Sequence, residues 1–146
     1  MRDNILVETD FLFGLNVRDK LYPYVIELLE RHRKRMVNIV LSPAAPLEAS
    51  LVMLSRGFSL DKVVRVLKLM DAKLIEYKVY SYTPLTLGIM VRALETRSKY
   101  PRLTLFDSIH IATAKVTGYT LVTSDKTIAR VMEREGLDYI EYHDIV

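Results

Sequence analysis

Three short runs of apolar residues constrain the fold of this chain more than any other feature of its sequence. They span residues 4–9 (NILVET), 38–42 (NIVLS) and 120–124 (TLVTS). Each run is apolar almost throughout instead of alternating between apolar and polar residues, which is typical of strands that helices bury on both faces. The runs therefore predict an α/β fold built on a parallel sheet.

The segments between these runs carry apolar residues at helical spacing. Residues 19–35, for example, place Leu21, Val25, Leu28 and Leu29 on one helical stripe. We expect the other helices over residues 44–57, 59–77, 83–100, 106–118 and 125–136, and a last strand over 137–142. These elements predict a central parallel sheet of four or five strands flanked by helices.

The composition fits one globular domain over residues 1–146, because 50% of the residues are hydrophobic and 27% are charged. No apolar run approaches the roughly 18 residues that a membrane span needs, and the first residues carry no signal-peptide pattern. The absence of cysteine excludes disulfides and thiolate metal sites. We therefore expect a cytoplasmic protein with no membrane contact.

Acidic residues lie where α/β proteins place their functional sites. Glu8 and Asp10 follow the first run, Asp125 follows the third, and Glu48 lies in the apolar helix after the second. Asp107 begins the helix that leads into the third run. Because sites form outside the carboxyl ends of parallel strands, four separate segments could bring these carboxylates to one edge of the sheet.

Clustered carboxylates repel one another unless a cation neutralises them. Oxygen ligands without His or Cys favour Mg²⁺ or Mn²⁺ over Zn²⁺. Such ions suit phosphodiester hydrolysis, in which one ion activates water and another stabilises the leaving oxygen. The net charge of +3 is compatible with a polyanionic substrate.

Each of these carboxylates also has a purely structural interpretation. Asp107 and Asp125 could be helix caps, and Asp10 could cap the turn after the first strand. Glu8 could mark the exit of that strand to solvent. Glu48 could lie on a solvated face of its helix, although a buried carboxylate there would need a partner.

Two other features are weaker candidates for function. His110 lies one turn after Asp107 and is predicted to be a packed or semi-exposed histidine. The basic run RHRKR, residues 31–35, could be a helix end whose cations complement the dipole, or a patch that contacts phosphates. In the second case the nucleic-acid-binding residues would be Arg31, Arg33, Lys34 and Arg35.

Three segments together resemble the PIN-domain family of metal-dependent nucleases, which includes VapC-type toxins. Residues 103–126 (LTLFDSIHIATAKVTGYTLVTSDK) are similar to the family's pattern of an aspartate, an Ala-Thr-Ala helix, a glycine turn, a strand and then T-x-D. ILVETDFLFGL (residues 5–15) and LSPAAPLEASLV (residues 41–52) resemble the first-strand and second-strand motifs. The resemblance covers nearly the whole chain.

The resemblance implies an acidic set around Mg²⁺ or Mn²⁺, with a further acidic position that orients water and three supporting hydroxyls. It also implies a homodimer and, for the toxin branch, a small antitoxin protein as partner. The implied acidic set is Glu8, Glu48, Asp107 and Asp125; Asp10 is the water-orienting position, and the supporting hydroxyls are those of Thr9, Thr123 and Ser124.

One residue departs from the family pattern, because Glu8 stands where the family usually has aspartate. The extra methylene moves the carboxylate outward by roughly 1.5 Å, and Mg²⁺ demands near-ideal octahedral geometry. We therefore expect a shifted first site, a larger share of ligation by Asp10, or weak activity.

The leading hypothesis is a metal-dependent ribonuclease that cleaves within RNA, with the toxin of a toxin–antitoxin pair as its biological setting. The alternative is a catalytically impaired PIN-like domain that binds RNA or protein without cleaving. A phosphatase with an aspartate nucleophile after the first strand is disfavoured, because that position is Glu8 and no phosphate-binding loop is visible.

Overall fold

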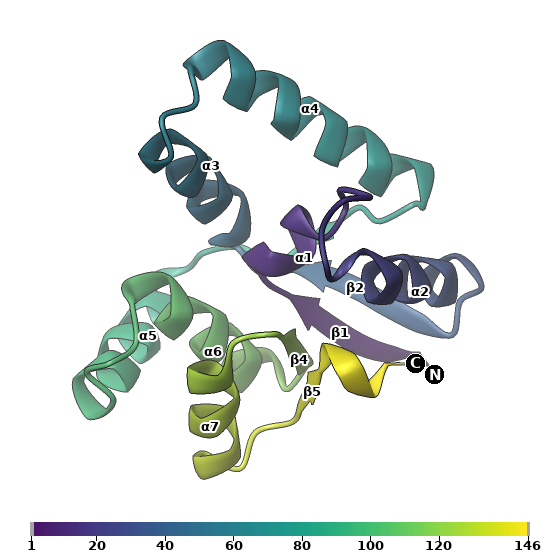
Figure 1. Ribbon diagram of the computed structural model, residues 1–146. Helices are drawn as coiled ribbons and strands as arrows, with labels where there is room; N and C mark the ends of the chain where they lie inside the picture. Colours follow the sequence, from purple (N-terminus) through teal and green to yellow (C-terminus); the bar gives the residue numbers. More distant parts are fainter. Residues whose placement is uncertain (1, 146) are drawn as a thin grey trace.

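The computed structural model describes residues 2–145 and shows helices alternating with strands (Figure 1). No helix among these residues is both long enough and apolar enough to cross a membrane. In chain order the elements are β1 (Asp3–Val7), α1 (Thr9–Phe13), α2 (Tyr22–Arg33), β2 (Val37–Leu41), α3 (Ala45–Ser55), α4 (Leu60–Glu76), β3 (Ser81–Tyr82), α5 (Leu87–Lys99), α6 (Leu105–Thr117), β4 (Thr120–Thr123), α7 (Lys126–Arg134), β5 (Tyr139–Glu141) and the 3₁₀ turn η1 (Tyr142–Asp144).

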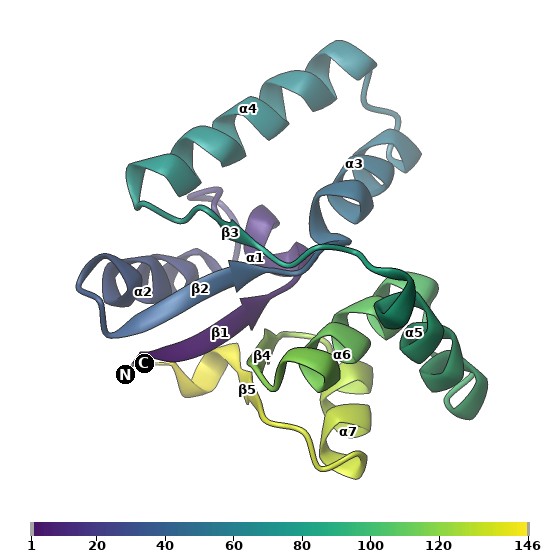
Figure 2. The ribbon, with the colours of Figure 1, turned by 180° about the vertical axis from the view of Figure 1, so that it is seen from behind.

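The five strands form one parallel sheet in the order β3-β2-β1-β4-β5. This confirms the predicted α/β fold with a central parallel sheet flanked by helices. The central strand is β1, whose last residue Val7 pairs with Leu41 of β2 and Val122 of β4. Strand β3, at the β2 edge (Figure 2), was not predicted, because two exposed residues show no periodicity.

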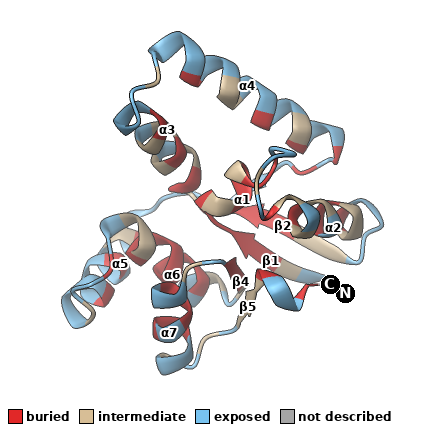
Figure 3. Ribbon diagram, in the orientation of Figure 1, coloured by how far each residue is buried: buried red, intermediate tan, exposed pale blue. Residues whose placement is uncertain are grey.

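Helices cover both faces of the sheet, and the strand side chains alternate between the two covers. Ile5 and Val7 pack with α1 and α2 on one face, whereas Leu6 packs with α6 and α7 on the other. Figure 3 shows the strands and the inward sides of these helices as the buried part of the molecule. Burial on both faces explains why the strands read as continuous apolar runs.

The remaining helices extend the fold beyond the sheet. Helix α5 packs on α6 through Ile89 and Ala93, which contact the buried Ile109 and Ala112. Helices α3 and α4 form an antiparallel pair that stands away from the sheet in Figure 1, and α4 is exposed along most of its length (Figure 3).

Two boundaries differ from the predicted ones for reasons of backbone pairing. The first strand ends at Val7, and Thr9 already begins α1. Helix α5 begins at Leu87, capped by Thr86, instead of near Thr83. The Thr83 N–H still donates to the Leu41 carbonyl at 3.0 Å, so this part of the chain continues the β3 pairing and cannot yet turn into a helix.

The strand order sets the place where a site can form. From β1 the chain first adds β2 and β3 on one side and later adds β4 and β5 on the other. The order therefore reverses between β1 and β4, and the carboxyl ends of these two strands flank a crevice of the kind in which α/β proteins bind ligands.

Candidate functional site: an acidic cluster at the carboxyl edge of the sheet

Four segments deliver acidic side chains to this edge. Glu8 leaves β1, Asp125 follows β4, Glu48 lies in the first turn of α3, and Asp107 lies in the first turn of α6. They are close enough for their charges to act on one another: Asp107 and Glu48 raise the pKa of Glu8, and Asp125 raises the pKa of Asp107. The structure thus places the predicted acidic residues at one edge of the sheet.

Glu8 has the least favourable electrostatic environment of these four carboxylates. Its side chain is buried, at 6% exposure, and its Oε2 atom has no hydrogen-bond partner among residues 2–145. Burial raises the pKa of Glu8 well above its usual value, and the charge of Asp10 raises it further, while the Thr123 hydroxyl partly offsets both. An ionised Glu8 therefore needs a cation beside it.

Glu48 is held by two donors on a single oxygen. Its Oε1 accepts from the Thr9 hydroxyl at 2.5 Å and lies 2.9 Å from Nε2 of His110. Burial alone would raise the pKa of Glu48, but the contacts with His110 and Thr9 outweigh burial and lower it. Glu48 is therefore stabilised as an anion.

Asp107 and Asp125 are helix caps, as their structural interpretation predicts. Asp125 is the N-cap of α7, where Oδ1 accepts from the N–H groups of Thr127 and Ile128. Asp107 completes a capping box at α6: its N–H donates to the Thr104 hydroxyl, and its Oδ2 accepts from the Thr104 N–H. The pKa of Asp107 is raised, chiefly by burial.

These four carboxylates share one property. In the part of the chain that the structure describes, each keeps one oxygen that accepts no hydrogen bond: Oε2 of Glu8, Oε2 of Glu48, Oδ1 of Asp107 and Oδ2 of Asp125. In Asp107 and Asp125, helix capping and cation binding consequently do not compete, because the cap uses one carboxylate oxygen and leaves the other for a cation.

Asp10 differs from these four, because both of its oxygens are occupied. Oδ2 accepts from the Ser124 N–H at 2.8 Å and from the Ser124 hydroxyl at 2.6 Å, and Oδ1 accepts from the Tyr142 hydroxyl at 3.1 Å. A carboxylate offers about four acceptor sites, so one remains. Asp10 clamps α1 to the end of β4 and to η1, which the sequence did not predict.

The predicted supporting hydroxyls each contact a different acidic group. Thr9 donates to Glu48 and Ser124 donates to Asp10. Thr123, which is fully buried, lies against Glu8 and accepts from the Asp125 N–H at 3.0 Å. The sequence analysis did not single out Tyr142, whose position depends on a contact over 132 residues.

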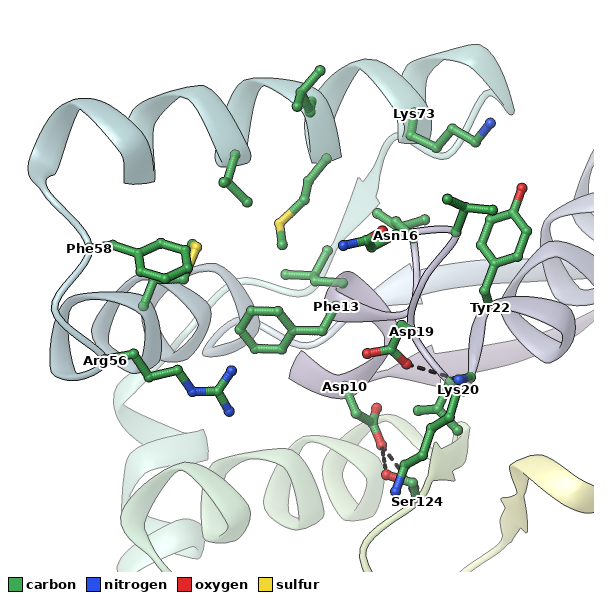
Figure 4. A pocket seen from close by; sticks show the side chains of 18 residues that line it. Asp10, Phe13, Asn16, Asp19, Lys20, Tyr22, Arg56, Phe58, Lys73 and Ser124 are labelled. Atoms are coloured by element: carbon green, nitrogen blue, oxygen red, sulfur yellow. Dashed lines mark hydrogen bonds between the residues drawn. The ribbon is translucent and has the colours of Figure 1, made fainter.

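A groove adjoins the acidic cluster (Figure 4). It lies between α1, the following loop and the α3–α4 pair, and it has a volume of about 810 Å³. Asp10 and Ser124, each close in sequence to one of the four carboxylates, line it, but none of the four carboxylates does. Lys20 points toward Ser124, and Arg56 lies beside the Phe13 ring. Neither cation makes an ion pair with an acidic residue in the range 2–145. We call this feature the α1–α4 groove.

The basic run, by contrast, lies at the opposite edge of the sheet. Residues 31–35 span the end of α2 at Arg33 and the turn before the amino end of β2, whereas the acidic cluster lies at the carboxyl ends of the strands. Arg31 pairs with Glu27 and donates to the Ile145 carbonyl, and Arg33 pairs with Glu30. These contacts favour the structural interpretation of Arg31 and Arg33.

One other group of side chains has the spacing of cation ligands. Glu141, His143 and Asp144 each offer a donor atom, and these atoms lie within 4.8 Å of one another. No other three acidic or histidine side chains among residues 2–145 come that close, so the four carboxylates stand farther apart. His143 and Asp144 are exposed, and exposed groups of this kind are common without an ion.

The residues of the acidic cluster fit a hard divalent cation. The buried, unbonded Oε2 of Glu8 is a costly arrangement that a cation would relieve. The donor set is made of oxygens, which Mg²⁺ and Mn²⁺ prefer.

Comparison with known proteins agrees with this architecture. A family model described as the PIN domain matches residues 5–133. Among solved structures, FitAcB from Neisseria gonorrhoeae superposes with a TM-score of 0.68 at 16% identity, covering 95% of this chain and 98% of that one. PAE2754 from Pyrobaculum aerophilum gives a TM-score of 0.63 at 18% identity, covering 99% and 94%.

A third solved structure, FitAB bound to an IR36 DNA fragment, gives a TM-score of 0.66 at 17% identity and covers 94% of each chain. At these identities the likeness concerns the fold. Comparison with curated proteins finds no match.

Proposed function

Because this chain belongs to the PIN-domain family, we propose that it is a metal-dependent ribonuclease that cleaves within RNA. PIN domains are generally nucleases. The observation that carries the proposal is the set of four carboxylates, each with one oxygen left without a hydrogen bond, at the carboxyl edge of the sheet. Mg²⁺ or Mn²⁺ is the proposed cofactor.

Some residues of the site would bind the cation, and others hold these ligands in position. Glu8, Glu48, Asp107 and Asp125 would hold the cation, which when bound supplies positive charge at the phosphate and activates water for attack on phosphorus. Thr9 holds Glu48, and the α6 and α7 caps hold Asp107 and Asp125 in place before any ligand arrives. These contacts reduce the number of side-chain positions that binding must order, although the four carboxylates must still approach one another to share a cation.

The α1–α4 groove is the surface that we assign to the substrate, because Asp10 and Ser124 line it and lie close in sequence to Glu8 and Asp125. Lys20 and Arg56 offer positive charge on its walls, and Phe13 and Phe58 offer rings on which an unpaired base can stack. Single-stranded RNA is the substrate class that matches this combination, because its bases are free to leave the stack.

We also propose two protein partners, both suggested by the family. One is a small antitoxin protein; the related FitAB was solved together with DNA, which fits an antitoxin that binds DNA. The other is a second copy of this chain. Two exposed apolar stripes support a homodimer: Leu47, Leu51 and Leu54 on α3, and Leu87, Val91 and Leu94 on α5. The proposed setting is the cytoplasm, where RNA substrates lie.

The test is cleavage of a single-stranded RNA by the purified protein with Mn²⁺ or Mg²⁺. We expect cleavage that stops in excess chelator, and loss of cleavage in Asp107→Asn, which keeps the size of the side chain and removes its charge. Calorimetric titration of Mn²⁺ into the wild-type protein should show binding, which Asp107→Asn weakens.

Other outcomes would favour different functions. Equal cleavage in excess chelator would exclude the metal mechanism. RNA binding without Mn²⁺ binding or cleavage would favour the alternative in which Glu8 spoils the first site and the domain acts as a binding module.

A further inference from the structure

His110 is a completely buried histidine that connects three segments of the site. It lies on α6 with 0% exposure. Its Nδ1 lies 2.5 Å from the hydroxyl of Ser42, which directly follows β2, and its Nε2 lies 2.9 Å from Oε1 of Glu48 on α3. The expectation of a histidine that merely packs in the core is therefore incomplete, because both ring nitrogens have side-chain partners.

Hydrogen bonding assigns the donor at each contact. An ionised Glu48 can only accept, so Nε2 of His110 donates to it. In the neutral ring Nδ1 then accepts, and the Ser42 hydroxyl donates to it. Ser42 itself is fixed to the sheet, because its N–H donates to the Val7 carbonyl at 2.9 Å. A continuous relay of hydrogen bonds thus runs from the end of β2 to Glu48.

This relay determines which oxygen of Glu48 is free. His110 and Thr9 both contact Oε1, which fixes the carboxylate and leaves Oε2 without a partner among the described residues. Mutation of a group that orients a metal ligand in this way typically lowers metal affinity about 10- to 100-fold.

We propose that His110, anchored by Ser42, is a positioning residue that presents Oε2 of Glu48 to the divalent cation. The inference rests on the proposed function, and it adds two residues that do not touch the cation themselves. It requires that the donor at Nε2, not the bulk of the ring, is what the site needs.

A second buried histidine provides a matched control. His32 on α2 lies 3.0 Å from the Lys78 carbonyl through Nε2, and its Nδ1 accepts from the Ile39 N–H at 3.0 Å. Both partners of His32 are backbone groups, near the amino end of β2. Replacing His32 therefore tests the loss of a buried histidine without touching the acidic cluster.

The experiment measures Mn²⁺ affinity by calorimetry in His110→Leu, His110→Gln, Ser42→Ala and His32→Leu, with melting temperatures recorded in metal-free buffer. We expect His110→Leu to weaken Mn²⁺ binding about 10- to 100-fold. His110→Gln, whose amide can still donate to Glu48, should retain most of the affinity. Ser42→Ala should weaken binding by a smaller factor, and His32→Leu should lower only the melting temperature.

The outcomes separate this inference from the function on which it rests. A wild-type protein that binds no Mn²⁺ would overturn both. Wild-type binding with unchanged affinity in a folded His110→Leu would overturn the positioning role alone. If His110→Leu does not fold, Ser42→Ala decides: unchanged Mn²⁺ affinity in that variant overturns the relay, and weakened affinity supports it.

Discussion

At the scale of single residues, Glu8 shows how a site can be built at the expense of stability. Its carboxyl group is buried with an unbonded oxygen and lies near the charges of Asp10, Asp107 and Glu48. Burial raises its pKa well above the usual 4.5, so the native protein keeps a proton that the unfolded chain releases above that pH. Native stability from this group is therefore full below about pH 4.5 and is lost as pH rises toward the native pKa.

We predict that Glu8→Gln melts at a higher temperature than the wild-type protein at pH 7.5 in metal-free buffer, by about 3 °C or more, since each kcal/mol is worth roughly 2–4 °C in a domain of this size. At pH 4.5 the difference in melting temperature should shrink, because the wild-type Glu8 side chain is then neutral, as the glutamine side chain is at both pH values. Differential scanning calorimetry at the two pH values measures this.

The control for this prediction is Glu95→Gln, which makes the same chemical change at an exposed position and is melted at the same two pH values. Adding Mn²⁺ should reverse the order of stability, because the wild-type protein gains from binding and Glu8→Gln does not. Identical melting of Glu8→Gln and wild type at pH 7.5 would show that Glu8 carries no electrostatic cost.

At the scale of elements, the helix caps and the acidic cluster use the same side chains. Asp125 caps α7 through Oδ1 and leaves Oδ2 free. Asparagine caps helices about as well as aspartate, whereas alanine does not. The two functions of Asp125 can therefore be separated by a pair of substitutions.

We predict that Asp125→Asn keeps the unfolding free energy within about 0.5 kcal/mol of wild type, while Asp125→Ala loses about 1 kcal/mol. Both variants should bind Mn²⁺ more weakly. Urea denaturation gives the stabilities and calorimetric titration the affinities. Wild-type Mn²⁺ affinity in Asp125→Asn would assign Asp125 to capping alone.

The exposed faces of α3 and α5 carry a second prediction at this scale. Leu87 is 86% exposed and Val91 56%, an unusual arrangement for a helix that faces only water. We expect the protein to be a dimer by light scattering after size exclusion, and Leu87→Glu with Val91→Glu to be monomeric. Met36→Glu, at the amino end of β2, should stay dimeric; a monomeric wild type would contradict the proposal.

At the scale of the whole molecule, two groups of cations lie at opposite edges of the sheet. Lys20 and Arg56 line the groove beside the acidic cluster, whereas Arg33 and Arg35 belong to the basic run before β2. Phosphate contacts by the run stay a prediction from the sequence, and the structure offers the groove cations as the alternative.

We predict that Lys20→Ala and Arg56→Ala, made in the Asp107→Asn background, each weaken RNA binding and reduce the salt slope by about one. Arg33→Ala and Arg35→Ala should change the slope less. Fluorescence anisotropy of a labelled single-stranded RNA across a KCl series measures both. If the salt slope changes only in Arg33→Ala and Arg35→Ala, the basic run and not the groove contacts the RNA phosphates.

The sequence predicted the parts of the molecule that depend on local pattern. Buried strands leave continuous apolar runs, and the carboxyl-edge rule then grouped the carboxylates of Glu8, Asp10, Glu48, Asp107 and Asp125. What it missed depends on contacts across the fold. Strand β3 is two exposed residues long, and Ser42 meets His110 across 68 positions of the chain.

The clamp on Asp10 was missed for the same physical reason. Its partners Ser124 and Tyr142 lie 114 and 132 positions away, and no local pattern marks them. Spacing alone therefore could not tell a carboxylate with a free oxygen from one whose oxygens are both occupied.

The order of the segments along the chain has a consequence for synthesis. The central strand β1 ends at Val7, whereas its neighbour β4 begins only at Thr120 and the last of the four carboxylates, Asp125, follows β4. A nascent chain therefore carries an incomplete acidic cluster until Asp125 has been added. If the proposed cleavage needs all four carboxylates, a chain synthesised only as far as residue 124 lacks the activity.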